Sequence, residues 1–110
     1  MKHLALVFVL ACSFTGCDSG AIAAAEAKTL VQQGALLIDV RTPDEFDVKH
    51  LDGAINIPVD QLEARASELP KDKDLILYCR SGTRSAQGRT TLSRSGFARV
   101  HDLGAMKNWK

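Results

Sequence analysis

Apolar residues along the chain follow two alternating patterns. Continuous apolar runs, without a polar residue at every second position, occur over 35–40 and 75–78, and such runs predict strands covered on both faces of a parallel sheet. Elsewhere apolar residues recur three and four positions apart, which predicts helices with one buried face. One such stripe comprises Val59, Leu62, Ala66 and Leu69. The alternation predicts one α/β domain with a central, mainly parallel sheet flanked by helices, and a site at the carboxyl ends of the strands.

Residue types that are typical of helix starts and helix ends mark several expected boundaries. An alanine-rich helix over 23–33 is expected to stop at Gly34, since glycine is favoured just past a helix end. Thr42 is followed by a proline and, three positions on, by Glu45. A capping residue, a proline at the first helical position and a glutamate at the third together predict a helix start. Asp60 is expected to cap the helix that follows it. The remaining elements are a strand over 54–57 closed by Pro58, a helix over 83–95 closed by Gly96, a strand over 97–100, and a final turn at Met106 and Trp109 that packs on the core.

The segment Cys79-Arg80-Ser81-Gly82-Thr83-Arg84 carries the candidate chemistry. Its cysteine ends a strand and a helix follows at once, so backbone N–H groups and the positive helix end favour the thiolate, which is the reactive form. Four residues separate Cys79 from Arg84, one fewer than in the Cys-x5-Arg loop of tyrosine phosphatases. The smaller ring of N–H donors suits one extra sulfur atom on the cysteine better than a phosphoryl group.

In this loop the chain resembles the rhodanese family of sulfurtransferases, whose active-site loop commonly reads C-R-S-G-x-R. The resemblance covers nearly all of the chain after the first thirty residues. Its further motifs are Asp39-Val40-Arg41, Glu45-Phe46, the run from His50 to Pro58, Gly96-Phe97, and Leu103-Gly104-Ala105 followed by Trp109. Ala105 departs from the family's usual second glycine.

The resemblance implies a thiosulfate sulfurtransferase, comparable to small exported rhodaneses of the phage-shock type. Cys79 would attack the outer sulfur of thiosulfate, sulfite would leave, and the resulting persulfide would pass its sulfur to cyanide or a thiol acceptor. The expected substrate-binding residues are Arg80, Ser81, Gly82, Thr83 and Arg84, with backbone N–H groups on the outer sulfur and the two guanidinium groups on the sulfonate. No cofactor is expected, and no motif identifies the acceptor.

Two other functions use the same features. A non-catalytic binding or sulfur-carrier module would tolerate loss of Cys79, but the intact cysteine and loop arginines argue against it. Phosphatase or arsenate reductase chemistry is disfavoured by the short loop. His50 is expected to organise a turn and His101 to pack on a strand. Asp39 and Arg41 lie at a strand end, and a structural ion pair or a helix-start contact is expected for them rather than a part in shaping the pocket. Three scattered histidines and one usable cysteine give no metal-ligand spacing, so we expect no metal.

The length of the chain limits the number of domains, and its charge limits the classes of molecule that it is expected to bind. The 110 residues have room for one domain. The net charge is +1, and removal of residues 1–16 would leave 13 basic and 13 acidic residues, so nucleic acid is not an expected partner. Between Asp74 and Asp102 there is no acidic residue but there are five arginines. This segment should attract small anions such as thiosulfate.

The first sixteen residues predict an export signal, with a basic start, an apolar core and no acidic residue. Phe14-Thr15-Gly16-Cys17 resembles a bacterial lipobox, so we expect a lipid on Cys17 that anchors the protein to a bacterial membrane in the periplasm. Cleavage after Ala23 or Ala25 is the alternative. Residues 17–25 are expected to form a tether and 26–110 the rhodanese-like domain, in which Cys79 has no disulfide partner.

Overall fold

A four-stranded sheet, parallel between all neighbours, forms the centre of the fold. The computed structural model describes residues 20–110. The strand order is β2-β1-β3-β4, so β3, which ends at Cys79, is an interior strand. The prediction of one α/β domain with a parallel sheet and flanking helices is confirmed. The strands are β1 (Leu36–Asp39), β2 (Ile55–Asn56), β3 (Leu75–Cys79) and β4 (Val100–Ala105).

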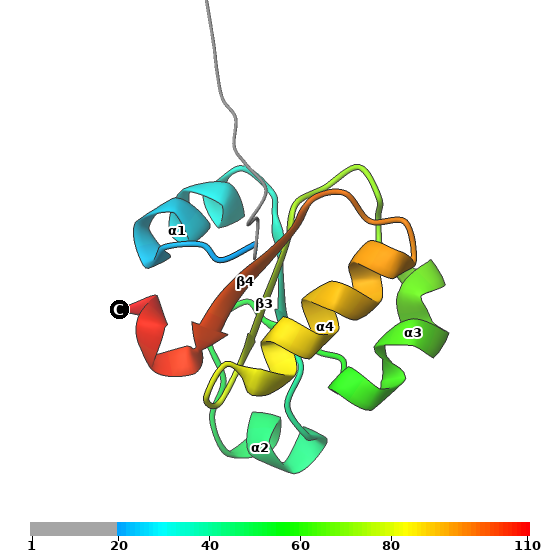
Figure 1. Ribbon diagram of the computed structural model, residues 1–110. Coiled ribbons are helices and arrows are strands. Elements are labelled where there is room, and N and C mark those ends of the chain that lie inside the picture. Colours follow the sequence, from blue (N-terminus) through cyan, green and yellow to red (C-terminus); the bar gives the residue numbers. More distant parts are fainter. Residues whose placement is uncertain (1–19) are drawn as a thin grey trace, which may run out of the picture.

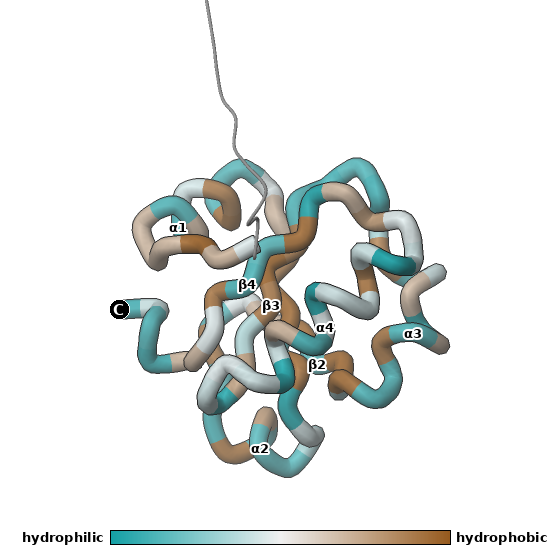
Figure 2. Tube along the Cα trace, in the orientation of Figure 1, coloured by the Kyte–Doolittle hydropathy of each residue, from teal (hydrophilic) through white to brown (hydrophobic). Residues whose placement is uncertain are grey.

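Helices cover both faces of the sheet (Figure 1). They are α1 (Ala24–Gln32), α2 (Pro43–Val48), α3 (Leu62–Arg65) and α4 (Thr83–Arg94), with 3-10 turns η1 (Val59–Gln61), η2 (Ala66–Glu68) and η3 (Met106–Trp109). Residues of α3 and α4 pack into one core cluster and residues of α1 and η3 into another. The most apolar segments are the central strands between these layers (Figure 2). This burial on both faces is why β1 and β3 are apolar without alternation.

Strand β3 supplies side chains to both clusters. Leu75, Leu77 and Cys79 join the cluster beneath α3 and α4, whereas Ile76 and Tyr78 join the cluster beneath α1 and η3. All five residues are buried. Because successive strand residues point to opposite faces, Cys79 lies on the α4 side of the sheet.

The helix start at Thr42 is confirmed, since the structure forms a full capping box there: Glu45 N–H donates to Thr42 Oγ1, and the Glu45 carboxylate accepts the Thr42 N–H. The cap expected at Asp60 is wrong. Asp60 lies within η1, and α3 begins at Leu62 without a side-chain cap. The tight turn after Pro58 places Asp60 inside the first turn rather than before it.

The last strand was expected over 97–100 but runs over 100–105. Phe97 instead closes the end of α4, where its N–H donates to Leu92 O at 3.1 Å and its ring is buried. The expected final turn is confirmed as η3, with Met106 and Trp109 packed against the second cluster. A buried apolar residue can lie in a strand or in the connection before it, so the apolar character of Phe97 did not show which of the two contains it.

The domain begins earlier than expected. Residues 20–25, assigned in the sequence to a tether, belong to the fold: Ile22 is buried, and its N–H donates to Asp102 O at 3.0 Å. A parallel bridge joins Ala21 to Asp102. The signal over 1–16, Cys17 and the start of the tether lie outside the described residues. Within 20–110, no helix has the length and apolarity required to cross a membrane.

Candidate active site

Cys79 lies at the carboxyl end of β3, as the position of a site in a parallel sheet predicts. The loop that follows leads directly into α4, whose N-cap is Gly82. Gly82 has φ +104°, a conformation that side-chain-bearing residues rarely adopt, and it lies against Gly104 of β4. The glycine therefore lets the chain fold back over the sulfur.

Hydrogen-bond donors converge on Cys79 Sγ. The N–H groups of Gly82 and Ser85 donate to it, with nitrogen–sulfur distances of 2.9 and 3.3 Å. The Ser85 hydroxyl oxygen lies 3.6 Å from Sγ and donates to Gly82 O at 3.1 Å. A hydroxyl proton can rotate between acceptors, so Ser85 can donate to the sulfur once it is ionised.

These donors control the ionisation of the cysteine. Burial by itself raises the pKa of Cys79, but hydrogen bonds from the Ser85 hydroxyl and from the N–H groups of Ser85, Gly82 and Ser81 outweigh it. The pKa of the Cys79 thiol is therefore below its ordinary value. A thiolate at this position is nucleophilic without a separate general base.

Ser85 was not among the residues singled out in the sequence. It is fully buried and is the third residue of α4, where a backbone N–H has no partner within the helix. The signal available in the sequence was a small hydroxyl residue in the first turn of a helix that directly follows a candidate nucleophile.

Arg84 is held by Glu45 of α2. Its guanidinium forms two hydrogen bonds with the carboxylate, at 2.7 and 3.1 Å. Arg84, and next the Thr42 N–H, lower the pKa of Glu45 to about 2. The pair holds α2 against the loop, and the guanidinium of Arg84 faces the Glu45 carboxylate.

Arg80 is the exposed cation of the loop. It lines a hollow of about 300 Å³ together with residues of α2 and Met106. Ser81 and Thr83 are also exposed, and Thr83 begins α4. Of the expected binding residues, Arg80 thus faces solvent beside the cysteine, Gly82 binds the sulfur, and Arg84 is paired.

Of the two roles expected for Asp39 and Arg41, the structure shows the ion pair. Both are buried, and Arg41 donates to the carboxylate through Nε and Nη2 at distances of 2.6–3.0 Å. Arg41 also donates to Lys49 O, and Asn56 donates to the carbonyls of both members of the pair. This network joins the end of β1 to the segment after α2 and supports the site from one side.

Of the described residues, the two histidines, His50 and His101, take no part in the loop. His50 stacks on Phe46, with ring centroids 3.7 Å apart. His101 Nε2 lies 2.8 Å from Asp74 Oδ1, at the opposite end of the sheet from the cysteine. Among residues 20–110, no three His, Cys, Asp or Glu side chains lie close enough together to hold a metal ion.

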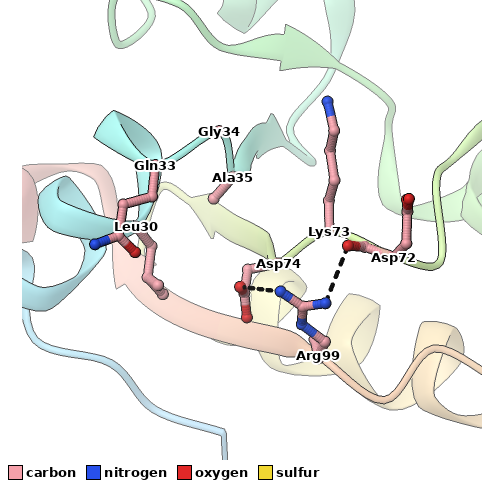
Figure 3. A pocket seen from close by; sticks show the side chains of 8 residues that line it. All are labelled: Leu30, Gln33, Gly34, Ala35, Asp72, Lys73, Asp74 and Arg99. Carbon is pink, nitrogen blue, oxygen red and sulfur yellow. Dashed lines mark hydrogen bonds and ion pairs between the residues drawn. The ribbon is translucent and has the colours of Figure 1, made fainter.

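A second pocket, of about 150 Å³, lies near the amino ends of the strands (Figure 3). Its wall includes Asp72, Lys73, Asp74 and Arg99, and no residue of the cysteine loop. Arg99 donates to Asp74 at 2.8 Å and to the Asp72 carbonyl at 3.0 Å. Arg99 is therefore already paired, and no cysteine, serine or threonine lines this pocket.

Comparison with known proteins agrees with this geometry. A family model described as a rhodanese-like domain matches residues 23–110. The protein YqhL of Bacillus subtilis is 43% identical over 76 residues, which cover 68% of this chain and 60% of that protein. Thiosulfate sulfurtransferase PspE of Escherichia coli is 37% identical over 73 residues, covering 64% of this chain and 70% of PspE. The structure of human single-domain sulfurtransferase TSTD1 superimposes with a TM-score of 0.74 at 25% identity, covering 82% of this chain and 94% of TSTD1.

Proposed function

The chain belongs to the rhodanese-like domain family, and from that premise we propose that it is a thiosulfate sulfurtransferase that works through a persulfide on Cys79. The observation that carries the proposal is the convergence of the Gly82 and Ser85 N–H groups on Cys79 Sγ. The names of PspE and TSTD1 support sulfur transfer, and that of PspE supports thiosulfate as the donor.

The reaction is a double displacement. In the first step the Cys79 thiolate attacks the outer sulfur of thiosulfate. A new S–S bond forms to Cys79, the bond to the sulfonate sulfur breaks, and sulfite leaves with the electron pair. In the second step a thiophilic acceptor attacks the outer sulfur of the persulfide and Cys79 leaves as the thiolate. No oxidant, reductant or cofactor is consumed.

The loop residues stabilise negative charge at each stage. The N–H groups that hold the thiolate can also bind the charge that moves to the outer sulfur of the persulfide. Arg80, exposed and adjacent to the nucleophile, is the group best placed for the sulfonate, because Arg84 is engaged by Glu45. Because Cys79 is fully buried, the donor reaches the sulfur only when part of this loop shifts.

Two other functions would use the same loop differently. A phosphatase needs donors around a phosphoryl group above the sulfur, whereas the donors here lie 2.9 and 3.3 Å from the sulfur itself. A module that only docks a partner would have no use for a thiol whose pKa is lowered. Both observations favour sulfur transfer.

The test is the intact mass of the protein before and after incubation with thiosulfate, with Cys79→Ser as the control. We expect a gain of one sulfur atom that is absent from the control and is removed by cyanide. No gain on a protein whose Cys79 titrates as a free thiol would refute the thiosulfate mechanism and favour the binding module.

We also propose that a lipid on Cys17 holds the protein at a bacterial membrane in the periplasm, as the lipobox resemblance of residues 14–17 suggests. Cells grown with radiolabelled palmitate should incorporate label into the protein, and Cys17→Ser should abolish it. No label in the parent chain would leave cleavage after Ala23 or Ala25 as the explanation, and label in the variant would refute attachment at Cys17.

A further inference from the structure

Two hollows lie next to the cysteine loop and share a wall. The near hollow, of about 300 Å³, is lined by Arg41, Glu45, Val48, Lys49, Arg80 and Met106. The far hollow, of about 350 Å³, is lined by Lys49, Leu51, Met106, Lys107, Trp109 and Lys110. Because Lys49 and Met106 line both, the two hollows lie side by side, and we call them together the acceptor groove.

The groove begins beside the cysteine loop, at the residue that follows the nucleophile. Arg80 in its near part directly follows Cys79, and Met106 directly follows Ala105, which is the β4 partner of Cys79 in the sheet. Figure 1 shows the loop after β3, helix α2 and the turn η3 at the same end of the sheet. From Arg80 the groove extends along η3 to Trp109, away from the sulfur.

The floor of the groove is apolar and exposed. Val48 is 87% exposed, an unusual position for a β-branched apolar side chain on a helix. Leu51, Met106 and Trp109 are only partly buried, although they pack against the core cluster below them. This exposed apolar surface beside the cysteine loop can receive the apolar side chains of a partner.

The rim of the groove is positively charged. In the part of the chain that the structure describes, no ion pair involves Lys49, Arg80, Lys107 or Lys110. The only acidic residue in the lining is Glu45, which is already paired with Arg84. The whole chain carries a net charge of only +1, so this concentration of unpaired cations is local.

We propose that the acceptor groove docks a second protein through an extended acidic segment with apolar side chains, and that a cysteine of this segment is the sulfur acceptor. A small thiol reacting at Cys79 would fill only the near hollow. A segment of several residues can place its thiol at Cys79, its apolar side chains on Val48 and Trp109, and its carboxylates on the lysines. Charge complementarity of this kind speeds encounter and selects partners.

The proposal rests on the proposed function for its chemical step. The acceptor thiol loses its proton to solvent and attacks the outer sulfur of the Cys79 persulfide. The bond between the two sulfurs of the persulfide breaks, Cys79 leaves as the thiolate, and the acceptor cysteine becomes the persulfide.

The test compares two synthetic peptides of equal length, each with one cysteine beside leucine and phenylalanine, one carrying glutamates and the other lysines. The variant is Lys107→Glu/Lys110→Glu, in the far hollow. The matched control is Lys73→Glu/Arg94→Glu, which makes the same charge change at exposed positions outside the groove. Sulfur transfer from the preformed persulfide is followed by the mass of each peptide.

We expect the acidic peptide to react faster than the basic one, and its rate to fall about tenfold in the groove variant but less than about twofold in the control. Persulfide formation from thiosulfate and transfer to mercaptoethanol should change by less than about twofold in both variants. Equal rates for the two peptides, equal losses in the two variants, or faster transfer to glutathione than to the acidic peptide at equal concentration would overturn the proposal.

A binding measurement separates this proposal from the proposed function. Trp109 is the only tryptophan in the chain, so its fluorescence reports occupation of the far hollow. An acidic peptide with serine in place of cysteine should change this fluorescence saturably, and the Lys107→Glu/Lys110→Glu variant should weaken binding about tenfold. If no persulfide forms on Cys79 but the peptide still binds in this way, the chemistry fails and the docking surface stands; no saturable change overturns the docking surface.

Discussion

Replacement of Ser85 by alanine tests how the loop stabilises the thiolate. The variant removes the hydroxyl 3.6 Å from Cys79 Sγ but keeps the Ser85 N–H, which donates at 3.3 Å. Gly82 O loses one donor but retains the Ala86 N–H at 3.2 Å, so no carbonyl is left unpaired. Alanine also fits the buried position, because it is smaller than serine.

The size of the effect follows from the geometry. A hydrogen bond to a charged group contributes about 1.5–3 kcal/mol. The long oxygen–sulfur distance, and competition from Gly82 O for the same proton, put this one nearer about 1 kcal/mol. A loss of about 1 kcal/mol lowers the thiolate fraction about fivefold at pH values below the pKa. The pKa of Cys79 should therefore rise, and persulfide formation at such a pH should slow about fivefold.

The assay is the ultraviolet absorbance of the thiolate as a function of pH, corrected with Cys79→Ser. Ser93→Ala, at an exposed position of α4, is the matched control and should follow the parent chain. A Ser85→Ala protein that remains folded and titrates like the parent, or at lower pH, would refute this account of the lowered pKa.

Two further substitutions test packing and charge. Gly88→Ala should destabilise the protein: helix propensity would contribute about 1 kcal/mol, but the new Cβ would lie 2.8 Å from both Leu62 and Leu77 in the core, and overpacking costs about 1–3 kcal/mol. Urea unfolding should show a net loss of about 1 kcal/mol, and a gain would contradict the packing argument. Because Arg84 lowers the pKa of Glu45 from 4.5 to about 2, the charged carboxylate adds stability above pH 4.5 that is lost as pH falls to about 2. Glu45→Gln should make the free energy of unfolding, measured by circular dichroism, depend less on pH in this range. An unchanged dependence would show that the pair between Glu45 and Arg84 is not its source.

Local residue patterns were sufficient to predict much of the fold. The runs at β1 and β3 are apolar on both faces because helices cover both faces, and that requirement is visible in the sequence. The capping box at Thr42 was predictable because all of its hydrogen bonds join residues within four positions of one another. The Asp60 cap failed for a related reason: the residue type was suitable, but the turn after Pro58 moved it inside the helical segment.

The sequence by itself determined the α/β class, the strand that delivers Cys79 and the short loop behind it, because these depend on residues that are neighbours in the chain. Only the tertiary structure decided that Arg84 faces Glu45 across 39 positions, that Ser85 turns inward to the sulfur, and that η3 meets α2 to form the acceptor groove. Such contacts depend on how the strands align and on which helix faces pack together. That alignment minimises the free energy of the whole core, so no local pattern of residues specifies it.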